Sequence, residues 1–371
     1  MFHLIFGLPW LVVAARFIQP LPWIWSLKIA FAVLLLAASQ YHLFSRISSG
    51  SVFSPEFPRP LIIGFNLLFG FILLLAVFQI ALDVVSLIMM PFKGHFPLVP
   101  AGVRYAMAAV AFGLSAFAVT QALRVPPLKD IEIAIPGLSP EFDGYQMVQL
   151  TDLHISRLFP AFWTRQVVEK TNALNADLIV ITGDLIDGKV EARTMDIAPL
   201  ADLRARDGVL TIPGNHEYFF GYEEWMKYYQ SLNMTTLANS HAVIERNGAE
   251  LVIAGVTDLS SSRTGFPVPD VAAAVRGAPA GAPIILLDHQ PRQAAENAKL
   301  GIAAQLSGHT HGGMIVGLDK VVAGPNNGFV SGFYDVGGMR LYVNDGTALW
   351  PGFALRLGIP SELTRITLRA R

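Results

Sequence analysis

The first 125 residues carry only nine charged side chains, although the whole chain of 371 residues contains 27 lysines and arginines and 28 aspartates and glutamates. Four apolar runs fill this part of the sequence, each near the ~20 residues that a helix needs to cross a bilayer. They cover residues 2–18, 23–44, 61–82 and 101–123. Prolines or short polar segments separate the runs. The sequence therefore predicts an N-terminal transmembrane region of four helices within residues 1–125.

These runs have two other interpretations. A large soluble core could also contain apolar helices, but soluble domains do not keep charges this sparse over such a length. The first run could be a cleaved signal peptide, but it lacks a basic start and a small-residue cleavage site. We therefore expect all four runs to remain in the membrane.

Basic residues give little guidance on the orientation of this region. Four spans would place both ends on one side, and the basic residues near the span ends divide four against four between the two sides. The first helix often dominates orientation, and its positive flank, Arg16 and Lys28, follows it. This favours placing the C-terminal domain on the extracytoplasmic side.

The rest of the chain, residues 126–371, has 20 basic and 26 acidic residues, whereas the first 125 residues have seven and two. We expect it to form a separate, soluble domain. A strongly basic face is missing, so nucleic acid is not an expected partner. The chain contains no cysteine, which excludes disulfides, a thiol nucleophile and thiolate metal ligands.

This second part alternates strands, loops and helices, which indicates an α/β fold. Short apolar runs typical of buried strands lead into Gly- and His-containing loops, and 161–174 has a helical pattern. Alternating runs near the C-terminus predict antiparallel edge strands at 340–343 and 363–368. We expect two packed β-sheets flanked by helices. The other predicted strands are 145–150, 178–182, 208–212, 251–256, 284–287 and 303–306.

The loops after these strands contain oxygen and nitrogen ligands of the kinds that hard-to-borderline divalent metals take. The ends of such strands are where open α/β sheets place their sites. Side chains two apart on an extended segment face the same way, which would pair Asp152 with His154 and His309 with His311. The five fragments are Asp152-Leu153-His154, Gly183-Asp184-Leu185-Ile186-Asp187, Gly214-Asn215-His216-Glu217, Asp288-His289 and Gly308-His309-Thr310-His311.

In this order the fragments resemble the calcineurin-like metallophosphoesterase superfamily, and within it a bacterial membrane-anchored group with an N-terminal multi-span region. The resemblance covers about residues 143–370. It implies two divalent metal ions, one held by Asp152, His154 and His311 and the other by Asn215, His289 and His309, with Asp184 bridging them. Manganese is the expected metal, while iron, zinc and nickel also suit these ligands.

The resemblance also implies the chemistry. A hydroxide bridging the two metals would attack phosphorus in line. His216 would be the general acid for the leaving oxygen, and Asp187 would hold that histidine in the correct tautomer. The location implied is the bacterial inner (cytoplasmic) membrane.

Three positions depart from related proteins. Gly188 stands where the protein Ser/Thr phosphatases of the superfamily have a phosphate-binding arginine, which argues against a phosphoprotein substrate. Met314 stands where relatives often have glutamine. Asp345 stands where relatives often have arginine, which puts in doubt the phosphate contact that this arginine would make.

Aromatic residues are frequent in the loops expected to surround the metals, around residues 158–163, 218–225, 266 and 349–353. They could form a membrane-facing rim, or they could pack the interior, and both interpretations stay open. With the membrane region, they favour hydrolysis of a phosphodiester or pyrophosphate bond in a lipid-linked substrate at the bilayer surface. The alternatives are a membrane-tethered phosphodiesterase for soluble nucleotides or small phosphoesters, and a non-catalytic membrane scaffold.

Overall fold

The computed structural model describes residues 2–370, and the chain folds into two compact units. The first unit comprises Met1–Ala122 together with the distant segment Pro351–Leu357. The second comprises Leu123–Trp350 and Gly358–Arg371. Each unit is described by itself below.

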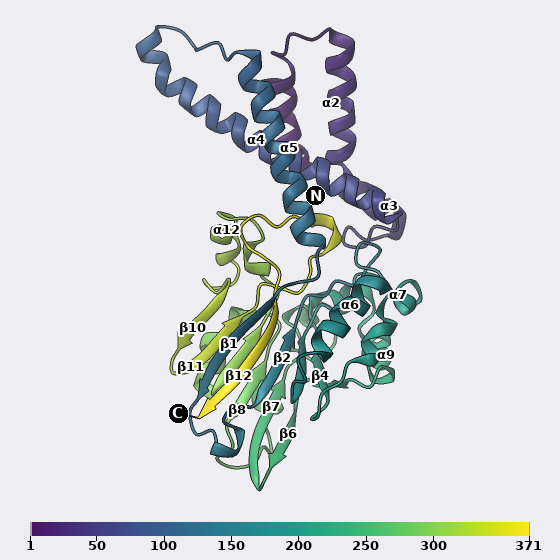
Figure 1. Cartoon of the computed structure of the whole chain (residues 1–371), viewed down its shortest axis with the longest axis vertical. Coiled ribbons are helices and arrows are strands. Elements are labelled where there is room, and N and C mark those ends of the chain that lie inside the picture. The colour runs from purple at the N-terminus through teal and green to yellow at the C-terminus, as the bar shows by residue number, and fades with distance from the viewer. Residues whose placement is uncertain (1, 371) are drawn as a thin grey trace. The chain divides into compact units, whose positions relative to one another are not determined.

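The first unit is helical (Figure 1). The longest helix, α4, begins after Pro58 and ends at Gly94, whose φ of 71° suits glycine at a helix C-terminus. Pro60 lies in its first turn, where a missing N–H costs nothing. The elements are α1 (Phe2–Val12), the π-helical turns of η1 (Val13–Ile18), α2 (Trp25–Ser39), α3 (Tyr41–Ser49), α4 (Arg59–Lys93) and α5 (Ala101–Leu123).

The structure supports two or three membrane spans more clearly than the four predicted from the sequence. Helices α4 and α5 are each long and apolar enough to cross a bilayer. The predicted span at 23–44 is two helices, α2 and α3, bent by 50° at Gln40, so it counts as a third only if the pair forms one bent span. The first predicted span is a shorter apolar helix, Ile5–Ile18.

Polar side chains connect the helices of this unit. Arg16 pairs with Asp83 of α4 at 2.9 Å, and Gln79 donates to the same carboxylate at 2.8 Å. Arg104 of α5 donates to the carbonyl of Arg16 at 2.8 Å and to Gln79 at 3.2 Å. These contacts bring Arg16, Asp83 and Arg104 together.

The segment Pro351–Leu357 is tied into the helical unit by buried hydrogen bonds. Asn66 of α4 donates to the carbonyl of Pro351 at 2.9 Å and accepts from the amide of Ala354 at 2.8 Å. The hydroxyl of Tyr41 also donates to the Pro351 carbonyl, at 2.9 Å. Buried backbone groups need such partners, so this segment of the C-terminal part of the chain is an integral piece of the helical unit.

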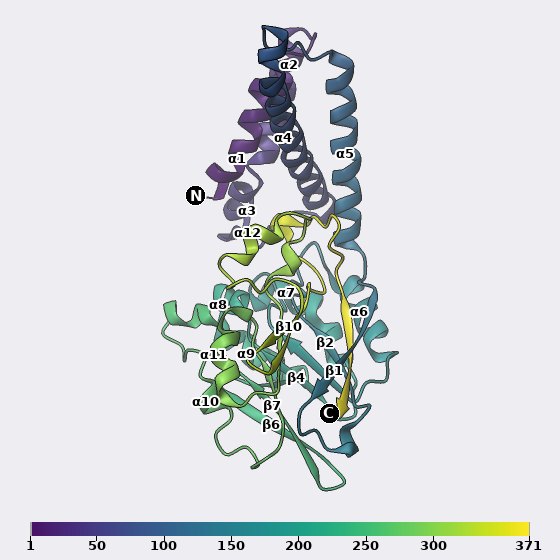
Figure 2. The ribbon, with the colours of Figure 1, turned by 90° about the vertical axis from the view of Figure 1, so that its left-hand side faces the viewer.

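The second unit contains two six-stranded sheets, with helices α6 and α7 beside the first (Figures 1 and 2). The first sheet has the order β1-β12-β2-β3-β4-β5, and the second β10-β11-β9-β8-β7-β6. The first contains β1 (Leu128–Ile135), β2 (Gln146–Leu150), β3 (Leu178–Thr182), β4 (Val209–Ile212), β5 (Thr235–Thr236) and β12 (Leu363–Ala370). The second contains β6 (Ser240–Arg246), β7 (Ala249–Gly255), β8 (Ile284–Leu287), β9 (Ala304–Ser307), β10 (Gly332–Val336) and β11 (Met339–Val343).

A buried apolar cluster lies between the two sheets. It takes alternate residues from each strand, such as Leu178 and Val180 of β3 and Leu251 and Ile253 of β7. Alternation is the pattern expected when one face of a strand packs on the opposite sheet. The helices of this unit are α6 (Ala161–Asn172), α7 (Val190–Ile197), α8 (Asn215–Phe220), α9 (Tyr222–Ser231), α10 (Val271–Ala274), α11 (Ala294–Asn297) and α12 (Asp319–Ala323).

The predicted α/β architecture of two sheets with helices is confirmed, but the prediction of C-terminal edge strands was wrong. β12 lies inside the first sheet, parallel to β1 and antiparallel to β2. β11 lies between β10 and β9 in the second sheet. The strand β1 had been missed, and pairing with it is what removes β12 from the edge.

Candidate metal centre

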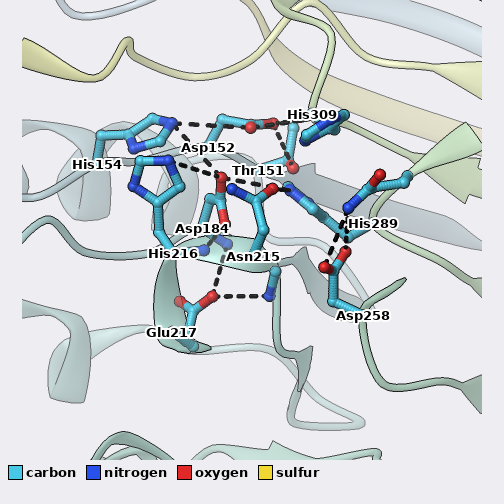
Figure 3. Close-up of polar contacts among 12 residues, drawn as sticks. Thr151, Asp152, His154, Asp184, Asn215, His216, Glu217, Asp258, His289 and His309 are labelled. Carbon is cyan, nitrogen blue, oxygen red and sulfur yellow. Dashed lines mark hydrogen bonds and ion pairs between the residues drawn. The ribbon is translucent and has the colours of Figure 1, made fainter. Parts of the chain in front are cut away.

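Five strands lead into the loops that carry candidate ligands, and side chains such as Asp184, Asn215 and His289 lie close together (Figure 3). Parallel strands β2, β3 and β4 are followed by Asp152, Asp184 and Asn215. In the second sheet β8 and β9 are parallel and are followed by His289 and His309. The carboxyl ends of the strands in two packed sheets thus supply one site, as expected for sheets of this kind.

The backbone of most of these residues lies in the left-handed region. The spacing of Asp152 and His154 predicted that both lie on an extended segment, and this prediction was wrong, because their φ angles are 52° and 43°. Asp184, His309 and His311 have φ angles of 53°, 71° and 50°. Such conformations are uncommon outside glycine and cluster at functional sites. Sharp turns, rather than a strand's alternation, bring the side chains together.

One group of candidate ligands comprises Asp152, His154 and His311. The Nε2 atoms of the two histidines are 3.3 Å apart, and they lie 3.8 and 3.5 Å from Oδ1 of Asp152. All three side chains are buried. These are the residues that the resemblance assigned to one metal ion.

A second group comprises Asp184, His289 and His309. Oδ2 of Asp184 is 3.3 Å from Nε2 of His289, and Oδ1 of Asn215 is 3.2 Å from the same nitrogen. Asp184 also belongs to a group with His154 and His216, at 3.9 and 3.8 Å from their Nε2 atoms. Its carboxylate therefore lies between the two groups, as a bridging ligand would.

The hydrogen bonds of the histidines suit metal binding. Nδ1 of His289 donates to the carbonyl of Thr182 at 2.7 Å, which directs Nε2 at Asp184. Nδ1 of His154 lies 3.1 Å from Asp187 Oδ2, which likewise leaves its Nε2 for a cation. Metal-binding histidines commonly have a carboxylate or carbonyl on the second ring nitrogen. The donors present thus fit a dinuclear divalent metal site.

The charges of the site favour ionised carboxylates. Burial opposes ionisation of Asp184, but the imidazoles of His289 and His216 hold its pKa well below the ordinary value. Burial alone would lower the pKa of His216, but the carboxylates of Asp184 and Asp187 outweigh it and raise that pKa to about 9. Bound cations would oppose this second shift.

Asp187 contacts two histidines. Its Oδ1 accepts a hydrogen bond from Nδ1 of His216, and its Oδ2 faces Nδ1 of His154 at 3.1 Å. The sequence prediction had connected Asp187 only with His216. The main chain of Asp187 is held in turn by Arg193, whose Nε donates to its carbonyl at 2.8 Å. Asp187 can therefore fix the tautomers of both rings at once.

Glu217 has a positioning role that sequence reasoning missed. Its buried carboxylate accepts hydrogen bonds from the amides of Asp184, Leu185 and Gly214 at 3.1, 2.8 and 2.7 Å. The hydroxyl of Tyr229 donates to it at 2.8 Å. Burial, followed by the charge of Asp184, raises the pKa of Glu217, while these donors oppose the shift. An acidic residue two positions after Asn215 was the only signal in the sequence.

Two glycines are required by close approach of the loops. A Cβ on Gly308 would lie 2.2 Å from Oγ1 of Thr151 and 2.4 Å from Oδ2 of Asp152. Gly183, with a φ of 92°, would place a Cβ 2.7 Å from the Nδ1 atom of His289. Side chains at either position would displace candidate ligands.

Most of the aromatic residues proposed to surround the site are interior residues. Phe159 and Trp163 are buried with their rings 4.8 Å apart, and Trp225 is buried with its indole N–H donating to the Gly188 carbonyl. Tyr222, Phe266 and Trp350 are half-buried, and Phe162 and Phe219 are exposed, with exposed fractions of 53% and 48%. The packing interpretation thus holds for the buried members of the set.

The three departures from related proteins can also be placed. Gly188 has a φ of 131° and Met314 a φ of 63°. Asp345 is buried, and a Cβ on Gly312 would lie 2.4 Å from its Oδ1. Its carboxylate therefore lies against the loop that carries His311. A negative side chain in this position cannot make the phosphate contact of an arginine.

The two sheets and the grouped carboxylates and imidazoles define the class of two-metal phosphoesterases. The family model described as calcineurin-like phosphoesterase matches residues 146–313. The chain is 30% identical over 236 residues to an uncharacterized metallophosphoesterase of Bacillus subtilis, covering 62% of this chain and 80% of that protein. The chain therefore belongs to the calcineurin-like metallophosphoesterase family.

Other relatives combine this domain with membrane segments. The chain is 34% identical over 270 residues to a transmembrane protein with metallophosphoesterase domain of Bos taurus, and 32% identical over 265 residues to one of Danio rerio. Each match covers 69% of this chain and 60% of the relative. The chain thus spans less than two thirds of the length of these relatives.

Proposed function

We propose that this protein is a membrane-embedded phosphohydrolase with a dinuclear metal site, which cleaves a phosphodiester or pyrophosphate bond in a lipid-linked substrate. The observation that carries the proposal is the position of Asp184. Its carboxylate lies within 3.9 Å of the Nε2 atoms of three histidines that belong to different loops.

In this proposal Asp152, His154 and His311 hold one metal ion, Asn215, His289 and His309 hold the other, and Asp184 is shared. When bound, the metals would activate the attacking water and neutralise charge on the phosphoryl oxygens. Manganese is the first choice, with iron, zinc and nickel as alternatives.

His216 is the candidate general acid. Its amide donates to Oδ1 of Asp184 at 2.8 Å, which fixes the start of α8 at the site. Its Nδ1 donates to Asp187, and the neighbouring carboxylates favour the protonated ring, whose Nε2 then carries the proton that the leaving oxygen needs. As the P–O bond breaks, that proton moves to the leaving oxygen, and Asp187 stabilises the orientation of the ring.

The lipid-linked substrate and the membrane location rest on two features. The same chain carries apolar helices long enough to cross a bilayer. Phe219, half exposed, has its ring 5.2 Å from the ring of His216, where an apolar substrate group could pack. We place the protein in the bacterial inner membrane, with α1 and η1 as a fourth crossing and the catalytic unit on the extracytoplasmic side.

A tethered phosphodiesterase for soluble nucleotides or small phosphoesters is the second candidate. The burial of Phe159, Trp163 and Trp225 favours it, because these side chains cannot contact a lipid chain. A non-catalytic scaffold is less well supported, since every candidate ligand is present and oriented.

The test is hydrolysis by the purified, detergent-solubilised chain with added Mn²⁺, on matched lipid-linked and headgroup-only diesters and pyrophosphates. Asp184→Ala is the inactive control. Faster cleavage of the lipid-linked member of a pair, lost in the variant, supports the proposal. Equal rates support the second candidate, and turnover on neither member rejects hydrolysis.

A further inference from the structure

A cavity of about 640 Å³ lies in the catalytic unit next to the proposed general acid. Its size is in the range of sites for small ligands, about 300–1,000 Å³. Tyr218 and Phe219, which follow His216 on α8, form part of its wall, and the Phe219 ring lies 5.2 Å from the His216 ring. Gln290, next in the chain to His289, forms another part. The cavity therefore adjoins the metal centre on the side of His216.

The charged side chains that line this cavity are both arginines. Arg263 lies at the end of the short 3₁₀ helix Leu259–Arg263, and Arg292 lies in the turn Pro291–Gln293 after β8. Both residues are exposed, and within residues 2–370 neither guanidinium has a carboxylate within ion-pair distance. No acidic residue is among those lining the cavity.

The other polar groups of the wall are neutral. Ser260, Ser262 and Thr264 line the same cavity, and the hydroxyls of Ser262 and Thr264 donate to backbone carbonyls at 2.9 and 2.8 Å. The Nε2 atom of Gln290 donates to both oxygens of Asp258 at 3.0 and 2.9 Å. The two arginines are therefore the groups of the wall that suit an anion such as a phosphate group.

The position of the cavity indicates which part of a substrate would bind in it. A general acid must reach the oxygen of the leaving group, so the leaving group lies on the same side of phosphorus as His216. The cavity begins at the residues that follow His216, so a leaving group would extend into it.

We propose that this cavity is the leaving-group subsite, in which Arg263 and Arg292 bind a phosphate carried by the leaving group. The inference rests on the proposed function and makes it narrower. The enzyme would then prefer a substrate in which a phosphoanhydride bond is broken and the leaving group is itself a phosphate. A diester with an uncharged leaving group would be a poorer substrate. Water adds to the attacked phosphorus, the P–O bond to the second phosphate breaks, and His216 protonates the departing oxygen.

The kinetic test compares two substrates with full-length, detergent-solubilised protein and Mn²⁺. A P¹,P²-dialkyl pyrophosphate has an anionic leaving group that carries a phosphate, and bis(4-nitrophenyl) phosphate has a leaving group without one. We expect the double variant Arg263→Gln, Arg292→Gln to lose about tenfold or more in kcat/KM on the pyrophosphate, the scale of a lost hydrogen bond to a charged group. On the nitrophenyl diester it should stay within about twofold of the parent protein.

The matched control is Arg276→Gln, an exposed arginine that is not part of the cavity wall. It should change neither rate. Equal losses on both substrates, or no loss on either, would overturn the subsite.

Binding separates this inference from the proposed function. Inorganic pyrophosphate is titrated calorimetrically into the EDTA-treated protein, where no turnover is possible. Weaker binding by the double variant than by the parent and Arg276→Gln supports the subsite even if neither substrate is hydrolysed. Identical binding by all three proteins rejects it, whatever the enzyme activity proves to be.

Discussion

The carboxylate of Glu217 accepts a hydrogen bond of 3.1 Å from the backbone amide of Asp184, the residue proposed to bridge the two metals. The same carboxylate accepts from the amide of Gly214 at 2.7 Å. One buried anion thus joins the loop after β3 to the loop after β4. The spacing between Asp184 and Asn215 depends on a residue that would contact neither metal.

Substituting Glu217→Gln should therefore lower both stability and metal content. A glutamine amide presents N–H groups to backbone donors, and a buried donor left without an acceptor costs about 1–3 kcal/mol. We expect a thermal midpoint several degrees lower and a reduced metal-to-protein ratio by mass spectrometry. Tyr229→Phe removes only one of the four hydrogen bonds and should have a much smaller effect. Unchanged metal content in Glu217→Gln would argue against the positioning role.

Substitutions of Asp184 and of His216 should have different effects, the first on metal binding and the second on proton transfer. Asp184→Ala removes the shared carboxylate, so metal content should fall together with activity. His216→Ala should keep its metals but slow turnover by about 10²–10⁴-fold, as expected for loss of a general acid. Metal analysis alongside steady-state rates distinguishes the two. Loss of both metals in His216→Ala would show that this histidine is a ligand rather than an acid.

Asp187→Asn should affect both functions at once. Its carboxylate contacts Nδ1 of His154 and Nδ1 of His216, so the neutral amide weakens the orientation of a ligand and of the acid. Loss of such a supporting carboxylate typically costs about 10–100-fold in metal affinity or activity. We expect a higher Mn²⁺ concentration at half-maximal activity and a lower kcat at saturating metal. A fall in kcat alone would limit its role to His216.

From the buried phenol of Tyr145 we predict how the free energy of unfolding changes at high pH. Burial, and then the Asp207 carboxylate that accepts its hydrogen bond at 2.7 Å, raise the pKa of the phenol above its ordinary value. Below pH 10 the phenol keeps its proton in the folded and in the unfolded protein, so its full contribution to the free energy of unfolding is present. Above pH 10 the phenol loses its proton only in the unfolded protein, and this contribution decreases. Each such tyrosine then removes about 1.4 kcal/mol per pH unit.

The measurement is the thermal midpoint of the detergent-solubilised protein between pH 8 and 11. Tyr145→Phe should start lower, because it lacks the hydrogen bond to Asp207, and then fall less steeply above pH 10. Parallel curves for the two proteins would contradict the assignment.

Asn66→Leu should release the segment Pro351–Leu357 from the helical unit. The change leaves the amide of Ala354 without its acceptor and removes a donor from the Pro351 carbonyl. We expect a loss of about 1–3 kcal/mol and faster tryptic cleavage after Arg356, which is 1% exposed in the parent. Thr120→Val is the control, since the Thr120 hydroxyl bonds only within its own helix. Equal cleavage in the two variants would show that Asn66 does not hold the segment.

The strands that lead to the site were predictable because each is a short, mostly apolar run before a glycine or a ligand. The run Leu178–Thr182 coincides with β3, and Ile284–Leu287 with β8. Two strands of mixed polarity, β1 and β6, were not predicted. β1 carries Ile131, Ile133 and Ile135 on alternate positions, a signal that was present but overlooked.

The hairpin of β6 and β7 had a second overlooked signal. Asn247 and Gly248 have φ angles of 49° and 84°, the positive values required at both central positions of the tight turn that Asn-Gly favours. The position of β12 in its sheet, by contrast, depends on pairing with strands that are far away in the sequence. No local sequence pattern indicates which strands these are.

Within the site, the types of candidate ligand could be read from the motifs, but their mutual support could not. Asp187 contacts two histidine rings, and Glu217 joins two loops. Both arrangements depend on left-handed turns at Asp152, His154 and Asp184, which change the directions of the side chains. Helix breaks are similarly invisible to hydropathy. The apolar run 23–44 hides the bend at Gln40 because one polar residue barely alters its average.

The passage of Pro351–Leu357 into the helical unit has a consequence for how the chain is made. During synthesis the helices α1 to α5 emerge first, yet the partners of Asn66 and Tyr41 are translated only after the whole of Leu123–Trp350. The membrane part is thus completed last, by a piece that arrives once the strands carrying Asp152 and Asp184 already exist. A fragment that starts after α5 would expose Phe353 and Leu355, both buried in this structure, because it lacks the helices that cover them.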